Sequence, residues 1–217
     1  MKRNNIVIGS VMAVIVAFAI GIFAYQSNTG KLRTEAAAQG GGSLVQFHSP
    51  STGPADAKVT LVEVFDPSCE ACRAFYPFVK SILAQNPQKV RLVLRYAAFH
   101  KNSDVVVKIL EAAKAQGLFW QSLEAVLKAQ PVWAAHDNPQ VERIWESLQP
   151  VGLDMERAKR DMQNPRIAEI LQQDMRDIKT LKVDRTPTFF VNGKPLLDTS
   201  PDGLRALVQQ EIKVSYP

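Results

Sequence analysis

Residues 6–25 form an uncharged, largely apolar run that follows the cations Lys2 and Arg3. As a helix, a run of this length would rise about 30 Å and could cross the hydrocarbon core of a bilayer. The pattern therefore predicts a short cytoplasmic N-terminus at residues 1–5 and a transmembrane anchor over residues 6–25. The alternative is a signal peptide that is cleaved after export, although such peptides usually have a shorter apolar region of about 7–15 residues.

The next segment, residues 26–43, is small and polar and ends in Gly40-Gly41-Gly42-Ser43. This composition predicts a flexible linker with a root-mean-square reach of roughly 20–25 Å. The positive residues that precede the anchor place the remainder of the chain outside the cytoplasm. We therefore expect residues 44–217 to fold in an oxidising compartment.

A nearly continuous apolar run at residues 59–65 predicts a strand that is buried on both faces of a sheet. Residues 90–96, which include two arginines, predict a second strand. Residues 44–48 alternate apolar and polar side chains and predict a further, outer strand. Between the strands at residues 59–65 and 90–96, apolar residues recur at helical spacing, which predicts a helix that ends near Asn86.

The region after residue 96 carries repeated helical patterns that are separated by capping and helix-ending residues. We expect five helices, which begin near Ser103, Phe119, Pro139, Asp154 and Pro165. The second is expected to stop at Ala129, because Pro131 follows. Together they predict a helical insertion over about residues 103–181.

A final apolar run at residues 188–191 predicts another strand. The pair Asn192-Gly193 then indicates a hairpin turn, and Ser200 caps a last helix.

The two cysteines of the chain, Cys69 and Cys72, lie where the first buried strand ends and a helix begins. At the start of a helix, unpaired backbone N–H groups and the macrodipole favour a thiolate at Cys69. Cysteines in such Cys-x-x-Cys pairs have their pKa lowered to roughly 3.5–7.5. Cys72 is expected to face the core and to act as the resolving thiol. The spacing therefore indicates a disulfide that can be exchanged with other proteins.

Two buried structural cysteines or a metal site are the alternatives to this chemistry. A structural zinc site needs four ligands, and no second cysteine pair or His-x-x-x-His follows. Cu(I) can be held by fewer soft ligands, so a copper(I)-binding or redox-sensing module is the second hypothesis. The first hypothesis needs no cofactor and no metal.

The strand, the Cys69–Cys72 pair, the helix and the distant segment Thr186-Pro187-Thr188-Phe189-Phe190 together resemble the thioredoxin superfamily. The turn Gly53-Pro54-Ala55 and the long helical stretch between the two motifs are similar to the DsbA-like branch of that superfamily. The resemblance covers residues 44–217. It implies a thioredoxin-like α/β fold, with a central mixed sheet and flanking helices, and thiol:disulfide oxidoreductase activity on client proteins.

Three further residues take their expected roles from this resemblance. Glu63 is the one charge in its strand, and family members carry a buried acidic residue at this spacing before the cysteines. That implies that Glu63 accepts the proton of Cys72, since burial would raise the Glu63 pKa towards the working range. The alternative is a solvent-facing glutamate on an edge strand. The resemblance also implies that Pro187 is cis and faces the disulfide, and that the Thr186 backbone pairs with the client chain.

Net charge and linker length limit the partners. A formal charge of +5 is too mild to indicate nucleic-acid binding. The resemblance implies a bacterial inner-membrane protein with its catalytic domain in the periplasm, and a membrane redox partner that reoxidises or reduces the cysteine pair. Because residues 26–43 are too short to be the dimerisation domain of the family's isomerases, we expect a monomeric catalytic unit.

Glu70 and two histidines carry separate expectations. Glu70 adjoins Cys69 and should oppose its thiolate. We therefore expect a redox potential below the roughly −120 mV of the strongest oxidases, towards the roughly −270 mV of thioredoxin. His48 is expected to be a surface or turn residue, and His100 a structural residue in a loop.

Overall fold

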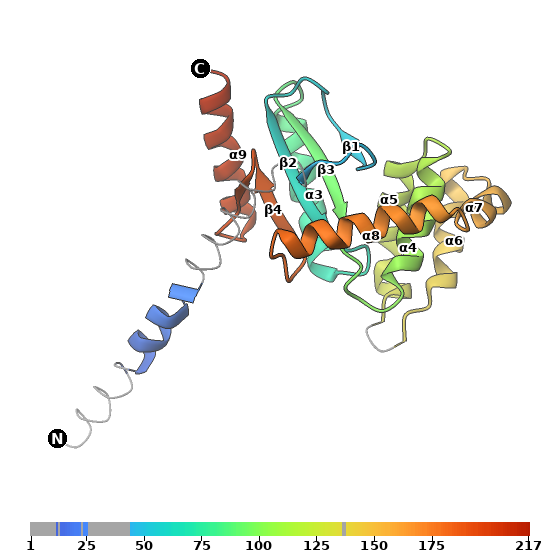
Figure 1. The fold of residues 1–217 in the computed structure, drawn as a ribbon, viewed down its shortest axis with the longest axis horizontal. Coiled ribbons are helices and arrows are strands. Elements are labelled where there is room, and N and C mark those ends of the chain that lie inside the picture. The colour runs from blue at the N-terminus through green and yellow to red at the C-terminus, as the bar shows by residue number, and fades with distance from the viewer. Residues whose placement is uncertain (1–11, 13, 23, 26–43, 136–137) are drawn as a thin grey trace.

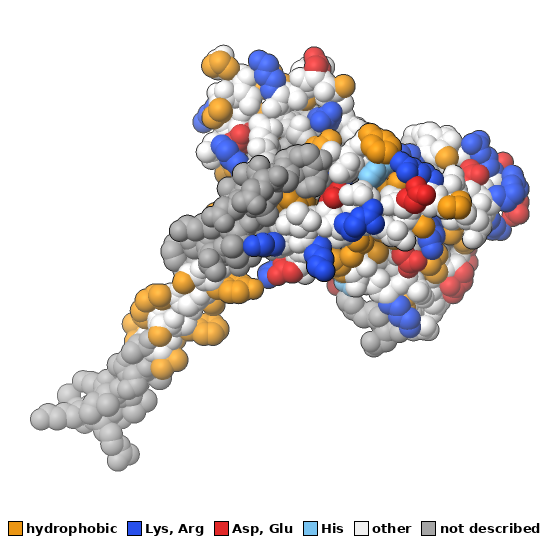
Figure 2. Space-filling model, in the orientation of Figure 1, with side chains coloured by type: hydrophobic (Ala, Val, Ile, Leu, Met, Phe, Trp, Pro, Cys, Tyr) orange, Lys and Arg blue, Asp and Glu red, His pale blue; other side chains and the backbone are white. Residues whose placement is uncertain are grey.

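The computed structural model describes residues 12, 14–22, 24–25, 44–135 and 138–217 (Figure 1). Part of the predicted anchor and all of the predicted N-terminus and linker lie outside these residues. The described part of the anchor is helical, and its apolar side chains, such as Phe18, are exposed (Figure 2). Among the described residues, no helix combines the length and apolarity needed to span a membrane.

A five-stranded mixed sheet forms the centre of the domain. Its strands lie in the order β1 (Ser51–Thr52), β3 (Val90–Tyr96), β2 (Val59–Phe65), β4 (Thr188–Val191) and β5 (Lys194–Pro195). The pair β2 and β3 is parallel, and the other neighbouring pairs are antiparallel. The strands predicted at residues 59–65 and 90–96 and the mixed sheet are confirmed.

The outer strand was predicted at the wrong place. It is β1, whereas residues 44–48 form a turn closed by a hydrogen bond from Ser49 N–H to the Gln46 carbonyl. The alternating pattern arises because Leu44, Gln46 and His48 face inwards. Leu44 enters the core, and the two polar side chains bond to carboxylates of a distant helix.

The two faces of the sheet are covered by different helices. Alternate residues of β2, including Leu61 and Phe65, pack on the face shared with α3 (Glu70–Gln85) and α9 (Pro201–Ser215). Val62 and Val64 pack on the opposite face, where α8 (Pro165–Thr180) crosses the sheet (Figure 1). Because side chains alternate along a strand, Glu63 projects to the α3 face.

The helical insertion consists of α4 (Ser103–Lys114), α5 (Phe119–Trp133), α6 (Ile144–Leu148), α7 (Met155–Asp161) and α8, with short 3₁₀ turns, η1 (Val141–Arg143) and η2 (Gln149–Val151), on either side of α6. Apart from α8, which crosses the sheet, the insertion lies at one end of it (Figure 1). The predicted end of α5 at Ala129 is wrong, because the helix continues through Pro131 to Trp133. The Trp133 ring is fully buried, and its Nε1–H donates to the Val126 carbonyl over 2.9 Å. This packing extends α5 beyond the proline, which is tolerated near the end of the helix.

The C-terminal elements follow the sequence prediction. Asn192 and Gly193, both with positive φ, form the turn between β4 and β5. The side chain of Ser200 then caps α9 by accepting a hydrogen bond from Gly203 N–H. This segment places β4 beside β2, which brings the residues that precede β4 to the edge of the sheet where the cysteines lie.

Candidate active site

Cys69 is the N-cap residue of α3, and Cys72 lies one turn further on. The backbone of Cys69 is extended, with φ −74° and ψ 119°, and its sulfur accepts a hydrogen bond from Cys72 N–H over 3.5 Å. Both cysteines are present as free thiols. Cys69 is 6% exposed and Cys72 is fully buried. Both cysteines are therefore buried at the helix start, and Cys69 is the one that retains a small exposed fraction.

The environment of Cys69 lowers the pKa of its thiol to about 5. The largest cause is a hydrogen bond from the Cys72 thiol, and Thr186 and the backbone N–H groups of Ala71 and Cys72 lower the pKa further. Burial acts in the opposite direction. Glu70, which was expected to oppose the thiolate, has an exposed side chain, and the pKa of Cys69 is lowered although Glu70 is adjacent. A thiol with this pKa is almost entirely ionised at neutral pH.

Cys72 has the opposite character. Burial raises its pKa well above that of an ordinary thiol, and the Cys69 sulfur and the Glu63 carboxylate raise it further. The neutral Cys72 thiol is thus the hydrogen-bond donor that Cys69 requires. The two sulfurs form one unit in which ionisation of the first keeps the second protonated.

Glu63 is buried in the central strand of the sheet, at 1% exposure. Its neighbours across the sheet are Leu94 on β3 and Phe189 on β4, so the alternative of an edge-strand glutamate is excluded. Burial raises the pKa of Glu63 to about 8, and the charge of Cys69 adds to this shift. A carboxyl group that titrates close to neutral pH can both donate and accept a proton there.

Thr186 and Pro187 are further residues of the site, and Thr186 lies beside the Cys69 sulfur. The peptide bond between them is cis, as the resemblance implied. The Cys69 sulfur lies 3.3 Å from the Thr186 carbonyl oxygen, to which Cys69 donates a hydrogen bond when its thiol is protonated. Both residues are only half-buried. The Thr186 backbone is therefore adjacent to the reactive sulfur and accessible from solvent.

Asp66 organises the loop before Cys69, a role that could not be inferred from the sequence because most of its partners lie more than 30 residues away. It is fully buried, and its carboxylate accepts hydrogen bonds from the N–H groups of Ser68, Phe99 and His100. The Ser103 hydroxyl donates to the same carboxylate over 2.6 Å, and the His100 ring lies 2.8 Å from it. His100 thus has the structural role that was expected, although its acidic partner is distant in the sequence.

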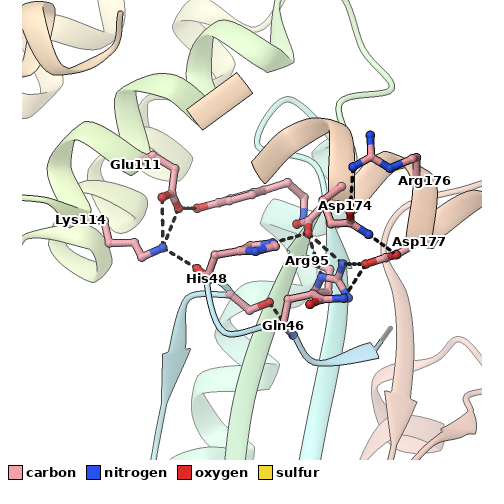
Figure 3. A network of polar contacts seen from close by, with 11 residues as sticks. Gln46, His48, Arg95, Glu111, Lys114, Asp174, Arg176 and Asp177 are labelled. Atoms are coloured by element: carbon pink, nitrogen blue, oxygen red, sulfur yellow. Dashed lines mark hydrogen bonds and ion pairs between the residues drawn. The ribbon is translucent and has the colours of Figure 1, made fainter. Parts of the chain in front are cut away.

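His48 lies in a turn, one of the two places expected for it, but it is buried rather than at the surface and belongs to a network on the α8 face (Figure 3). Its ring is 2.7 Å from Asp174, which also accepts hydrogen bonds from the buried Arg95. Arg95 pairs in addition with Asp177 over 2.6 Å. The Arg95 guanidinium and the two carboxylates of α8 compensate one another's charge. The contacts of Gln46 and His48 with the same carboxylates hold residues 44–48 against α8, so the network is structural.

Comparison with protein families gives one match over most of the domain. A family model described as Thioredoxin matches residues 47–210. Among curated proteins, 144 residues are 31% identical to the Na⁺/H⁺ antiporter NhaA of Herminiimonas arsenicoxydans, covering 66% of this chain. The match spans only 22% of the antiporter's length. A probable disulfide bond formation protein D of Bacillus cereus is 27% identical over 98% of this chain and 100% of its own length.

Two solved structures illustrate the similarity of fold. A thioredoxin-like oxidoreductase from Silicibacter pomeroyi matches with a TM-score of 0.65 and 26% identity, over 79% of this chain and 96% of the other. Oxidised BdbD from Bacillus subtilis matches with a TM-score of 0.67 and 21% identity, over 76% and 94% respectively. The thioredoxin-like fold and the resemblance to the DsbA-like branch are thereby confirmed.

Proposed function

Because this chain belongs to the thioredoxin family, we propose that it is a thiol:disulfide oxidoreductase that donates a Cys69–Cys72 disulfide to client proteins. The observation that carries the proposal is the sulfur of Cys69 at the start of α3, with a pKa of about 5 and the half-buried Thr186 carbonyl 3.3 Å away. The bacillary relative that matches over its whole length is itself named as a probable disulfide bond formation protein.

The proposed reaction begins with the oxidised pair. A client thiolate attacks Cys69 Sγ, the Cys69–Cys72 bond breaks, and its electron pair leaves on Cys72. Glu63, whose pKa is raised to about 8, is largely protonated at neutral pH and gives its proton to the Cys72 sulfur. Glu63 is thus the proposed proton carrier, and it accepts the same proton when the steps run in reverse.

The second client thiolate then attacks the client sulfur of the mixed disulfide. Cys69 leaves as a thiolate, and the client keeps the new disulfide, so two electrons have passed from client to protein. The low pKa of Cys69 favours this step, because a more acidic thiol is a better leaving group. Thr186 and Pro187 form the proposed binding edge, where the backbone of Thr186 pairs with the client chain beside the sulfur.

The cellular setting is part of the same proposal. Residues 6–25 would anchor the protein in the inner membrane of a bacterium, residues 26–43 would form the linker, and the domain from residue 44 would act in the periplasm as a monomer. A membrane redox partner would restore the disulfide by taking two electrons from the reduced pair. This arrangement would keep Cys69 within reach of a partner embedded in the same membrane.

Variants of the two cysteines test the proposal. Cys69→Ala should abolish disulfide transfer to a reduced dithiol peptide, because no sulfur remains for the client to attack. Cys72→Ala should instead accumulate a covalent client adduct at Cys69 when presented with a client disulfide, since the resolving thiol is missing. Full catalytic exchange by Cys72→Ala would contradict the assigned roles. Competition for Cu(I) against a chelator, measured on the same proteins, tests the copper hypothesis directly.

A further inference from the structure

Gln130 connects the helical insertion to the loop that carries the reactive cysteine. It lies in the part of α5 beyond the predicted helix end and is 1% exposed. Its side-chain Nε2 donates to the Pro67 carbonyl over 2.8 Å and to the Cys69 carbonyl over 3.1 Å. Its Oε1 accepts a hydrogen bond from Arg73 Nε over 2.8 Å. Both hydrogens of the Gln130 side-chain amide therefore bond to the loop, and the oxygen of that amide bonds to a side chain of α3.

The carbonyl of Cys69 is the group through which this contact acts. It already accepts the first hydrogen bond of α3, from Arg73 N–H over 3.2 Å, and Gln130 adds a second donor. Holding this carbonyl fixes ψ of Cys69, which decides where the following N–H groups point relative to the Cys69 sulfur. The ionised Arg73 polarises the Gln130 amide and strengthens its donation, since hydrogen bonds that involve a charged partner are the stronger ones.

We propose that Gln130 is a positioning residue that holds the backbone of Cys69 so that the N–H groups of Ala71 and Cys72 stay directed at its sulfur. The inference rests on the proposed function, because it concerns the reactivity of the same sulfur. The helical insertion then contributes to the reactivity of Cys69, because α5, which lies outside the thioredoxin core, supplies the contact that orients the Cys69 backbone. An apolar side chain at this position would leave the buried carbonyl of Pro67 without the donor shown here.

The test replaces Gln130 with methionine, which is similar in volume and flexibility but cannot donate. The Cys69 pKa is followed by the ultraviolet absorbance of the thiolate, and the equilibrium with glutathione is measured in parallel. We expect the pKa to rise by roughly a half to one unit and the equilibrium to shift roughly three- to tenfold towards the disulfide form. Val126→Ala is the control, because it truncates a fully buried apolar side chain in the same helix and leaves the hydrogen bonds of Gln130 to the loop in place.

Each outcome distinguishes positioning from a general loss of stability. If Gln130→Met shifts the pKa and Val126→Ala does not, at comparable losses of melting temperature, the proposal holds. An unchanged pKa in Gln130→Met, or an equal shift in both variants, overturns it. If the methionine variant does not fold, Gln130→Asn is measured by the same criteria, because it withdraws the amide by one methylene. A wild-type protein without exchange activity would refute the proposed function but leave this titration decisive for Gln130.

Discussion

Replacing Cys72 with alanine should raise the pKa of Cys69 from about 5 to between about 6 and 7. The hydrogen bond from the Cys72 thiol is the largest of the causes that lower this pKa. A hydrogen bond to a charged group contributes about 1.5–3 kcal/mol, which corresponds to about one to two pKa units. The backbone N–H groups and Thr186 remain in the variant, so the pKa should stay below that of an ordinary thiol.

Cys72→Ser is the matched control, because its hydroxyl group can still donate to the thiolate. The pKa of Cys69 in this variant should remain close to that of the reduced wild type. Both variants also lose the second sulfur, so any difference between them reports the donor alone. The assay is a pH titration of thiolate absorbance, checked by the rate of alkylation of Cys69.

A Cys72→Ala protein that still titrates at about 5 would refute this reasoning, since the acidity of Cys69 would then come from the helix start and Thr186 without help from the buried thiol. An equal Cys69 pKa in the Cys72→Ser and Cys72→Ala variants would also contradict the role given to the hydrogen bond from residue 72. In that case the donor contact could not be the dominant cause.

Three further measurements examine neighbouring parts of the site. Glu63→Leu should stabilise the reduced fold at pH 7 but not at pH about 4. The pKa of Glu63 is raised from 4.5 to about 8 by folding, so the folded state favours the protonated carboxyl group. The contribution of Glu63 to the free energy of unfolding is therefore complete below pH 4.5 and is lost as the pH rises towards 8. The difference between the two pH values should be about 3 kcal/mol in chemical denaturation, and an equal effect at both would contradict a neutral, buried Glu63. Thr186→Val should raise the pKa of Cys69 by up to about one unit, measured by thiolate absorbance, because it removes a hydroxyl donor. The redox potential of the Cys69–Cys72 pair, measured in a glutathione titration, should lie at about −220 mV. A Cys69 pKa of about 5, compared with roughly 7 in thioredoxin, favours the reduced form about 50-fold, which raises the potential by about 50 mV. A potential at or below about −270 mV would contradict this effect of the Cys69 pKa.

The parts of the fold that the sequence predicted are those set by neighbouring residues. The strand at 59–65 is a nearly continuous apolar run, which favours the centre of a sheet, and the strand at 90–96 is rich in valine and leucine over a similar length. The start of α3 at the cysteines is likewise local, because the N-cap and the first turn belong to one short segment. The potential acidity of Cys69 could be inferred for the same reason.

What the sequence could not predict depends on partners that lie far along the chain. The pattern at residues 44–48 suggested a strand because Gln46 and His48 face inwards, but their partners on α8 are more than 120 residues away. The Gln46 backbone, which a strand would have paired with a neighbouring strand, instead bonds within the turn to the Ser49 hydroxyl and N–H groups. Periodicity reports which residues are buried, and it does not report what they bond to.

Gln130 shows how a local rule can hide a residue of the site. Proline disfavours a helix interior, so ending α5 before Pro131 was reasonable from propensity alone. The burial of Trp133 outweighs that preference and carries the helix on for another turn. Because the helix continues, Gln130 takes a fixed direction and reaches the carbonyls of Pro67 and Cys69. The low pKa of Cys69 thus begins with the geometry of one helix start, and keeping that geometry depends on Gln130, which lies 61 residues later and reaches Cys69 only in the folded chain.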